Sequence, residues 1–262
     1  MTTRILSLLI AGVTALAVPT GAAMAASADP DHPDLTGFWE IPYTPIPPQR
    51  QATPFEQEMI DALPAGTLLL ADSGLKEFPP GDFGGLKVTN AARDHAAKYD
   101  IESQRDAATT CEPPSIIYAM QGPFPMEIFQ GRDMVVIKME YYDQVRIIPI
   151  DPKNDPDDWP DSTVGHSVGH WDGDTLVVRT NHISAATMLN NGLDHSNHMQ
   201  LTENIRLSPD GKTLAIMQIY EDPEVFEGRA ARIIPLHRRD DHVYPYACDP
   251  SYGVAVEERE KK

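Results

Sequence analysis

Residues 165–180, GHSVGHWDGDTLVVRT, decide the fold class of this chain. Two runs that suit extended backbone flank Asp172-Gly173, a dipeptide typical of the two-residue loop of a tight β-hairpin. A loop of these two residues predicts that Trp171 pairs with Asp174. Side chains alternate between the two faces of a strand, so the hairpin should present two sets of residues. One face carries His166, Val168, His170, Thr175, Val177 and Arg179, and the other carries Ser167, Trp171, Leu176 and Val178.

The same segment contains a pattern that suggests a different protein class. Residues 165–169 match the G-x-S-x-G pattern of serine hydrolases, in which a buried strand precedes the serine and a helix follows it. Here an acidic stretch with a proline, residues 157–162, comes before Ser167, and the predicted turn follows within a few residues. Both halves of the required context are missing. Ser167 is therefore predicted to be an ordinary strand residue and not a nucleophile.

Strand-like segments continue on both sides of this hairpin. They cover residues 127–130, 134–141, 145–150, 164–171, 175–181, 199–207, 213–220 and 232–238. Turn signals separate most of them, and short connections between consecutive strands force antiparallel neighbours. With too little helix for parallel crossovers, the pattern predicts a mainly β fold, an antiparallel meander closed into a lipocalin-like barrel or folded into a sandwich. The longer interruptions, residues 151–163 and 182–197, are expected to be loops at the barrel ends.

The part of the chain before these strands has a different composition. Residues 34–41 are expected to form a first strand, whereas residues 42–54 contain too many prolines to join a central ladder. Residues 55–63 and 91–104 have helical composition. We therefore predict a signal peptide over residues 1–25, an irregular and partly helical lead-in over 26–110, a β-barrel over 111–250 and a charged tail over 251–262.

The first 25 residues have the three parts of a cleavable secretory signal. Arg4 is followed by an apolar run over residues 5–18 and then by Ala23-Met24-Ala25. Cleavage should leave a mature chain that begins at Ala26. The sequence therefore predicts a periplasmic or secreted protein.

Export changes how the two cysteines are interpreted. Cys111 and Cys248 are far apart in the sequence, and in an oxidising compartment they predict one disulfide bond. A loop of this length would contribute roughly 4 kcal/mol in the chain-entropy description. Two buried free thiols are the alternative.

Charge limits the classes of partner. The formal net charge is −18, so nucleic acid and anionic membrane surfaces repel the chain. After the signal, the sequence contains no run of apolar residues long enough to cross a bilayer. The expected partner is a small-molecule ligand or substrate, with no nucleic acid and no membrane after signal cleavage. The composition does not specify an oligomeric state.

Several motifs taken together resemble those of a widespread family of exported bacterial proteins that is uncharacterised. They are DLTGFW at residues 34–39, PMEIFQ at 125–130, GHSVG with Trp171 and GDTLVV at 165–178, and His195-Ser196 with residues 203–206. The resemblance covers most of residues 34–240 and implies no activity, cofactor or substrate. Family members typically have Arg in place of His170 and an acid in place of Arg179, so these two are not expected to be shared catalytic groups. The matching candidates are His166, His195, Ser196, Glu203 and Arg206.

Histidine spacing argues against a metal site. His166 and His170 lie four residues apart on one strand, which separates them by roughly 13 Å, whereas the zinc motif with this spacing depends on a helical turn. His195, His198 and Asp194 would converge only if their segment turned, and the usual ligand spacing is missing. We predict no metal and no other cofactor, and leave open ligands that are distant in sequence.

Acid–base chemistry is the better interpretation of the polar candidates. A histidine beside a carboxylate that fixes its tautomer is a common catalytic device, and His166 or His195 with Glu203 would form one. Arg206 would then stabilise an anion. Glu203 and Arg206 point to opposite faces of a regular strand, so the alternative is that both are structural partners at the barrel rim.

Aromatic residues on the predicted strands either fill a core or line a cavity. Trp171, Tyr141 and Phe129, together with Ser196, are the candidate ligand-binding residues. A barrel of about eight strands is just wide enough to hold one small ligand. The sequence therefore favours an exported barrel that binds a small, partly apolar molecule. A cofactor-independent lyase, isomerase or hydrolase on the same scaffold is the second interpretation, and a structural envelope module is the third.

Overall fold

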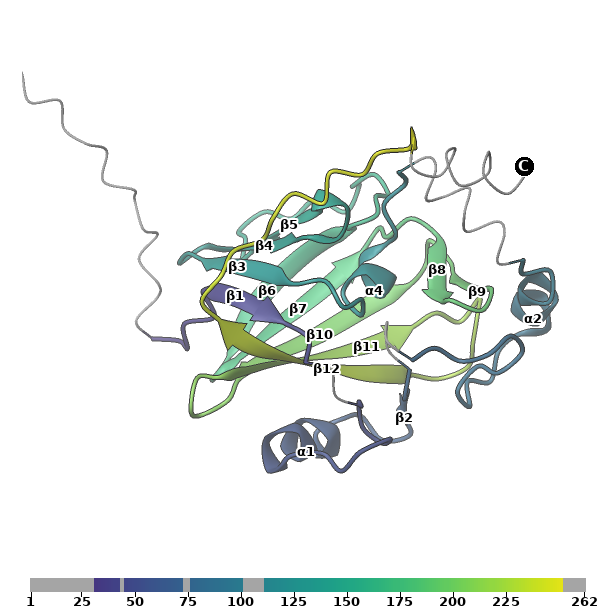
Figure 1. Cartoon of the computed structure of the whole chain (residues 1–262), viewed down its shortest axis with the longest axis horizontal. Coiled ribbons are helices and arrows are strands. Elements are labelled where there is room, and N and C mark those ends of the chain that lie inside the picture. Colours follow the sequence, from purple (N-terminus) through teal and green to yellow (C-terminus); the bar gives the residue numbers. More distant parts are fainter. Residues whose placement is uncertain (1–30, 43–44, 73–75, 101–110, 252–262) are drawn as a thin grey trace, which may run out of the picture.

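Nine strands follow one another around the sheet in the order β5–β4–β3–β1–β12–β11–β10–β7–β6 (Figure 1). Their bounds are Gly37–Glu40 for β1, Met126–Gln130 for β3, Met134–Met139 for β4, Val145–Pro149 for β5, His166–Asp172 for β6, Thr175–Asn181 for β7, Gln200–Leu207 for β10, Thr213–Glu221 for β11 and Ala230–Arg239 for β12. This computed structural model describes residues 31–42, 45–72, 76–100 and 111–251. The predicted signal peptide and most of the charged tail lie outside the described residues.

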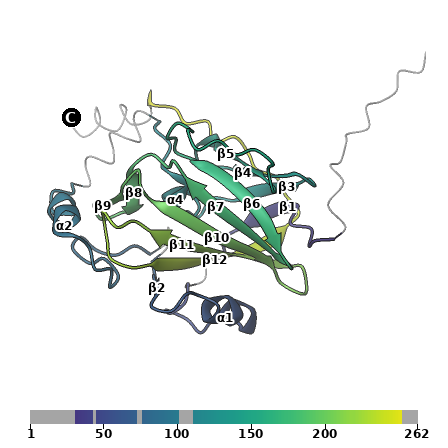
Figure 2. The ribbon, with the colours of Figure 1, turned by 180° about the vertical axis from the view of Figure 1, so that it is seen from behind.

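The sheet curves until its two end strands meet. All neighbours along the strand order are antiparallel, and β5 and β6 then touch through one parallel bridge between Ile150 and Gly169. The Asp151 amide donates to the Gly169 carbonyl at 2.9 Å across this seam. The protein is therefore mainly β and forms a nearly closed antiparallel barrel. This is one of the two predicted architectures. Figure 2 shows the β6, β7 and β10 side of the barrel from behind.

The central hairpin forms, but with a different loop from the one predicted. Trp171 pairs with Leu176 and Asp172 with Thr175, so the loop is Gly173-Asp174. Gly173 has a φ of 58° and Asp174 is not among the residues at positive φ, the combination of a type II′ turn with glycine first. The register is shifted by two residues from the prediction. Because side chains alternate with a period of two, both predicted faces keep their members.

Other elements also depart from the predicted bounds. The predicted loop over residues 182–197 contains a small hairpin, β8 (Ala186–Leu189) paired with β9 (Leu193–His195). The lead-in supplies β1 to the barrel and a short strand β2 (Leu68–Leu69), which runs parallel to β12. The predicted strand 134–141 stops at Met139, because Tyr141–Asp143 form a 3₁₀ turn in which Tyr142 has a φ of 56°.

Three described helices accompany the barrel. Helix α1 (Pro54–Asp61) starts at a capping box between Thr53 and Glu56. It covers an apolar outer face of β11 and β12, where it packs through Met59. Helix α2 (Asn90–Ala96) is shorter than the predicted 91–104, of which 101–104 are not described. Helix α4 (Ile116–Ala119) is short, and contacts β8.

The inner face of the barrel forms the main core. Inward-facing residues of neighbouring strands, among them Trp39, Ile128, Ile137, Ile205 and Ile234, are all buried. Burial of this apolar surface provides the main driving force for folding. The barrel interior is therefore filled by side chains.

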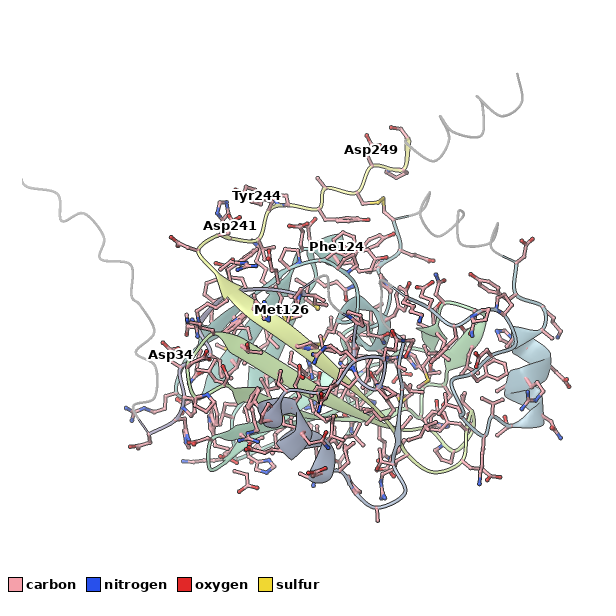
Figure 3. All side chains as sticks on the ribbon, turned by 60° about the horizontal axis from the view of Figure 1, so that its bottom comes forward. Asp34, Phe124, Met126, Asp241, Tyr244 and Asp249 are labelled. Carbon is pink, nitrogen blue, oxygen red and sulfur yellow. A yellow bond between two sulfur atoms is a disulfide. The ribbon has the colours of Figure 1, made fainter. Side chains whose placement is uncertain are left out.

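A disulfide bond closes the C-terminal end onto the start of the barrel region. Cys111 and Cys248 are bonded across a sequence separation of 137, as predicted. The segment before Cys248 runs over β3 and β4, where Lys138 donates to the Val243 carbonyl at 3.0 Å. Figure 3 labels Asp241 and Tyr244 along this segment, and Asp249 directly after Cys248. The disulfide indicates an oxidising, extracytoplasmic environment. The described residues include no helix of the length and apolarity needed to span a membrane.

Candidate functional site

Glu203 lies inside the barrel, where it is fully buried. One carboxylate oxygen accepts from the Arg146 guanidinium, and the other accepts from the Gln218 amide at 3.0 Å. Arg146 also donates to Ser167 at 2.9 Å and to Thr180 at 2.7 Å. These contacts occupy both Glu203 oxygens with structural partners. Ser167, which the alternation along β6 turns inward, is one of the partners of Arg146.

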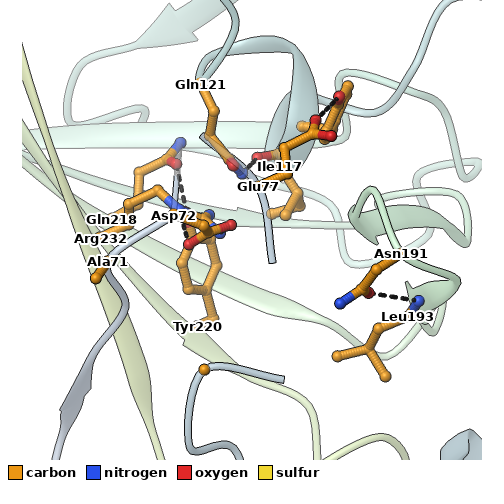
Figure 4. A network of polar contacts seen from close by, with 12 residues as sticks. Ala71, Asp72, Glu77, Ile117, Gln121, Asn191, Leu193, Gln218, Tyr220 and Arg232 are labelled. Atoms are coloured by element: carbon orange, nitrogen blue, oxygen red, sulfur yellow. Dashed lines mark hydrogen bonds and ion pairs between the residues drawn. The ribbon is translucent and has the colours of Figure 1, made fainter. Parts of the chain in front are cut away.

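The polar contacts continue across the barrel from Gln218. Its amide oxygen accepts from the Tyr220 hydroxyl at 2.6 Å, and Arg232 donates to that hydroxyl at 2.7 Å. Arg232 also donates two hydrogen bonds to the Asp72 carboxylate, at 3.1 and 2.6 Å (Figure 4). Burial disfavours a charged guanidinium, yet the Asp72 carboxylate keeps the pKa of Arg232 above its ordinary value. We call this series of polar contacts, from Ser167 and Thr180 to Asp72, the interior network.

His166 lies on the outer face of β6, opposite in direction to the neighbouring Ser167. Its ring contacts Asp155 at 2.6 Å and stacks on Trp159 with 4.4 Å between ring centroids. It helps to line a hollow of about 610 Å³ on this face, where Val168 and Leu201 are the apolar lining residues and His170 and Arg179 are among the polar ones. His166 and Glu203 are therefore on opposite sides of the sheet.

Arg206 also lies on the outer face, as the alternation along β10 required. It reaches Glu58 of α1 at 3.5 Å and places its guanidinium 5.4 Å from the centroid of the Phe55 ring. Both contacts hold α1 against the barrel. Arg206 therefore has a structural role in this geometry, and it shares no contact with Glu203.

His195 is buried at the end of the barrel that carries α2 and the β8–β9 hairpin. Its Nδ1–H donates to the Ser196 carbonyl at 3.0 Å, which fixes the tautomer, and Nε2 accepts from the Ser115 hydroxyl at 2.7 Å. Burial lowers the pKa of His195, so the ring is neutral at pH 7. Ser196 is engaged as well, with its hydroxyl donating to Asp222 at 2.9 Å. The predicted acid–base residues thus have separate sets of partners.

Among the predicted ligand-binding residues, Trp171 and Phe129 have different surroundings. Trp171 stacks on His32 at 4.5 Å between centroids. Phe129 faces outward from β3 with 46% of its surface exposed. Tyr141 is the predicted ligand-binding residue that borders a pocket at the α2 end of the barrel.

That pocket has four tyrosines in its lining, and we call it the tyrosine pocket. It has a volume of about 610 Å³. Its lining residues are His95, Lys98, Tyr99, Asp100, Glu112, Pro113, Pro114, Tyr118, Tyr141, Tyr142, Ala185, Ala186, Thr187, Gly192 and Asp194. They come from α2 and the residues after it, from α4 and the residues before it, from the 3₁₀ turn, and from the β8–β9 hairpin with Ala185. The labels α2, β8 and β9 lie together at one end of the barrel in both ribbon views (Figures 1 and 2).

Close packing joins these elements into one wall. His95 of α2 contacts Asp194 of β9 at 2.9 Å. Gly192, with a φ of 96°, lies against Tyr99, and a Cβ there would come within 2.4 Å of the Tyr99 Cβ. Only glycine allows the hairpin turn to approach this closely. The hairpin that the sequence did not predict is therefore one side of the pocket.

Aromatic contacts fix the opposite side. Phe124 stacks on Tyr141 with 4.3 Å between ring centroids, and Tyr246 meets Tyr141 edge-on at 5.5 Å. Tyr142 contacts both Tyr141 and Tyr246. Tyr246 is two residues from Cys248, so the disulfide holds this cluster against the pocket.

Glu77 adds a partly buried carboxylate behind the tyrosines. Its carboxylate accepts from the Tyr118 hydroxyl at 2.6 Å and from the Asn190 amide at 2.6 Å. Figure 4 shows it beside α4. Burial and the Glu77 charge raise the pKa of Tyr118 and of Tyr99, and burial with the neighbouring tyrosines raises the pKa of Tyr141 to about 12. The pocket thus has neutral phenols in a negative electrostatic environment.

Sequence reasoning missed most of this pocket. Tyr99 and Tyr118 fall in segments that were interpreted as lead-in and as the start of the barrel, and Glu77 has no motif around it. A usable signal was the local density of tyrosine in residues 118–142 close to Cys111. Among the described residues, no group of three His, Cys, Asp or Glu side chains is placed to hold a metal ion.

Comparisons with family models, with curated proteins and with solved structures found no match to this chain.

Proposed function

We propose that this protein is an exported β-barrel that binds a small, partly apolar molecule in the tyrosine pocket. The observation that carries the proposal is a cavity of about 610 Å³ with four tyrosines in its wall. Small-molecule sites typically have volumes of about 300–1,000 Å³, aromatic walls and a few fixed polar groups. The tyrosine pocket has each of these properties.

Backbone geometry at the pocket supports this choice. Tyr142 has a φ of 56° and Asp143 a φ of 54°, a left-handed conformation that bulky residues rarely adopt. The Asp143 carboxylate accepts from the Tyr246 and Ala247 amides at 2.9 and 3.2 Å and so holds the turn in place. Unusual backbone of this kind is concentrated at ligand sites.

The hollow around His166 is the weaker candidate for the same function. Its lining contains Val168 and Leu201 as apolar residues and no Phe, Tyr or Trp. A partly apolar ligand would gain less there from removal of its surface from water. The disulfide and the signal-like N-terminus support a periplasmic or secreted location for the binding function.

A pocket-filling variant tests the proposal. Ala185 is exposed on the pocket wall, so Ala185→Trp should fill the cavity without removing a described side-chain contact. Ala62, an exposed alanine at the end of α1, provides the matched control Ala62→Trp. A thermal-shift screen of hydrophobic and aromatic metabolites should find ligands that raise the Tm of the wild type and of Ala62→Trp but not of Ala185→Trp. Ligands that stabilise all three proteins equally would contradict the proposal.

A further inference from the structure

The tyrosine pocket is lined by more acidic than basic side chains. Lys98 lines the pocket together with the carboxylates of Glu112 and Asp194; Asp100 is also in the lining but has an interaction partner of its own and is left out of this comparison. His95 is the remaining titratable lining group apart from the tyrosines, and its contact with Asp194 uses one of these acids. Among the described lining residues, carboxylates therefore outnumber lysine and arginine side chains, in a chain whose net charge is already −18.

Glu77 strengthens this excess from behind the wall. Among the described residues, the donors to its carboxylate are neutral, the Tyr118 hydroxyl and the Asn190 amide. Such donors satisfy the oxygen atoms but do not cancel the charge. Since Glu77 is partly buried, the electric field of its carboxylate is screened less at the pocket than it would be in water.

The tyrosine rings add attraction of the same sign. The faces of aromatic rings carry negative electrostatic potential and attract cations, most strongly where the cation is desolvated. Tyr118 and Tyr141 are held by Glu77 and by Phe124, so their rings are fixed before a ligand arrives. Both phenols are neutral at physiological pH, and burial raises the pKa of each further above its ordinary value. Fixed rings reduce the entropy that binding would otherwise cost.

These features select against other ligand classes. A carboxylate or phosphate would be repelled by the lining and by the chain as a whole. A hard metal ion needs several oxygen ligands around one point, and the described residues contain no cluster of three acidic or histidine side chains so placed. A neutral molecule would gain nothing from the excess charge.

We infer that the ligand of the tyrosine pocket is an organic cation, an alkylated or quaternary ammonium group on a small apolar frame. This inference rests on the proposed function. The ammonium group lies against the tyrosine rings within the field of Glu77, and the apolar frame contacts Pro113, Pro114 and the alanines of the β8–β9 hairpin.

Isothermal titration calorimetry with paired probes tests the inference on the whole chain. The cationic probes are tetramethylammonium, choline and phenyltrimethylammonium. The neutral partners, 3,3-dimethyl-1-butanol for choline and tert-butylbenzene for phenyltrimethylammonium, replace the nitrogen by carbon and keep the shape. We expect at least one cation to bind at least tenfold more tightly than its neutral partner, and its affinity to disappear in Ala185→Trp.

Two further variants separate charge from shape. Glu77→Gln removes the charge and retains an oxygen that accepts from Tyr118 or Asn190, so it should weaken the cation at least fivefold and leave the affinity for neutral ligands unchanged. Glu58→Gln, on the exposed face of α1, is the matched control and should change neither. Thermal melting of each variant shows whether it is folded.

The outcomes distinguish the inference from the proposed function. If neutral partners bind as tightly as cations, and Ala185→Trp blocks both, the pocket binds small molecules but the inference is wrong. If neither cations nor any neutral screen compound binds, both are wrong. Cation binding that persists in Ala185→Trp or is unaffected in Glu77→Gln also overturns the inference.

Discussion

The interior network and the tyrosine pocket are built from the same residue types but differ in their counter-charges. Inside the barrel, Glu203 meets Arg146 and Asp72 meets Arg232, so two carboxylates face two guanidinium groups. At the barrel end, neutral donors hold Glu77. Charges that are neutralised within the fold specify its structure, whereas a charge that the fold leaves in excess is available to a ligand.

The difference also separates stability from binding. Removing one member of a buried ion pair leaves a charge without water or a partner, which is among the most destabilising changes in a protein. The pocket carboxylates are nearer to solvent, so the stability of the fold does not depend on a counter-charge beside each of them. Changes to the interior should therefore lower stability, and changes to the pocket should alter binding in a folded protein.

The largest effect is expected from Glu203→Gln. The substitution keeps the shape but strands the buried Arg146 charge, so the free energy of unfolding should fall by about 3–5 kcal/mol. Urea denaturation followed by far-UV circular dichroism measures it. The double variant Arg146→Met with Glu203→Met should recover part of the loss. A single-variant loss below about 1 kcal/mol would mean that the interior network is as dispensable as a surface contact.

The disulfide should contribute the next largest amount. Replacing Cys111 and Cys248 together by Ser removes a cross-link over a separation of 137 residues, and should cost about 2–5 kcal/mol. Because Tyr246 loses its anchor nearby, ligand affinity should also fall, unlike in a barrel variant of equal stability. Intact-mass measurement after alkylation, alongside denaturation, checks both. Freely alkylated thiols in the untreated protein would contradict the bond.

A smaller effect is expected from Ser115→Ala, which removes the donor to His195 Nε2 and should lower the free energy of unfolding, as measured by urea denaturation, by about 1–3 kcal/mol.

His195 also predicts a pH dependence of stability. Burial holds the folded pKa of His195 below its unfolded value of 6.5, so unfolding takes up a proton below that pH. Wild-type stability should therefore be intact above pH 6.5 and decrease as the pH falls from there toward the lowered folded pKa. His195→Gln should flatten this part of the pH–Tm profile, and an unchanged profile would assign the acid loss to other groups.

The smallest effect on stability at neutral pH is expected from Tyr141→Phe, which keeps the ring stack with Phe124. The raised folded pKa of Tyr141, about 12 against 10.0, favours the folded state at full strength below pH 10 and loses that contribution as the pH rises toward 12. Spectrophotometric tyrosine titration of the variant should lack one late-ionising phenol. If all tyrosines of the wild type titrate near pH 10, the pocket is open to water.

Local patterns in the sequence were enough to predict a mainly β fold of antiparallel strands, with a barrel and a sandwich as the alternatives. The alternation through residues 165–181 and the turn signals between strands determine antiparallel neighbours without knowledge of distant contacts. Even the error in the hairpin loop preserved both faces, since the shift was by two residues. The cysteine pair was predictable for a similar reason, because a chain with two cysteines allows one intramolecular pairing.

Pairings across long sequence distances were beyond such patterns. Glu203 was singled out as a catalytic candidate, but its partner Arg146 lies 57 residues away, and no motif links them. Tyr118 and Glu77 are separated by 41 residues. His166 and His195 were grouped with Glu203 because a histidine beside a carboxylate is a common acid–base pair, yet residue type does not say which side chains face the same space. Of the candidate ligand-binding residues named from the sequence, Tyr141 lines the tyrosine pocket.

The position of β1 has a consequence for the order in which the chain folds. This strand lies between β3 and β12, and Phe38 pairs with Arg239 at the far end of the sequence. During synthesis the first barrel strand must wait for the last one before both of its edges are paired. Contacts of such long range are slow to form, because their loop-closure entropy is lost before they stabilise anything. The nascent chain therefore carries an unpaired strand edge until it is almost complete, which is when a chaperone would be most needed.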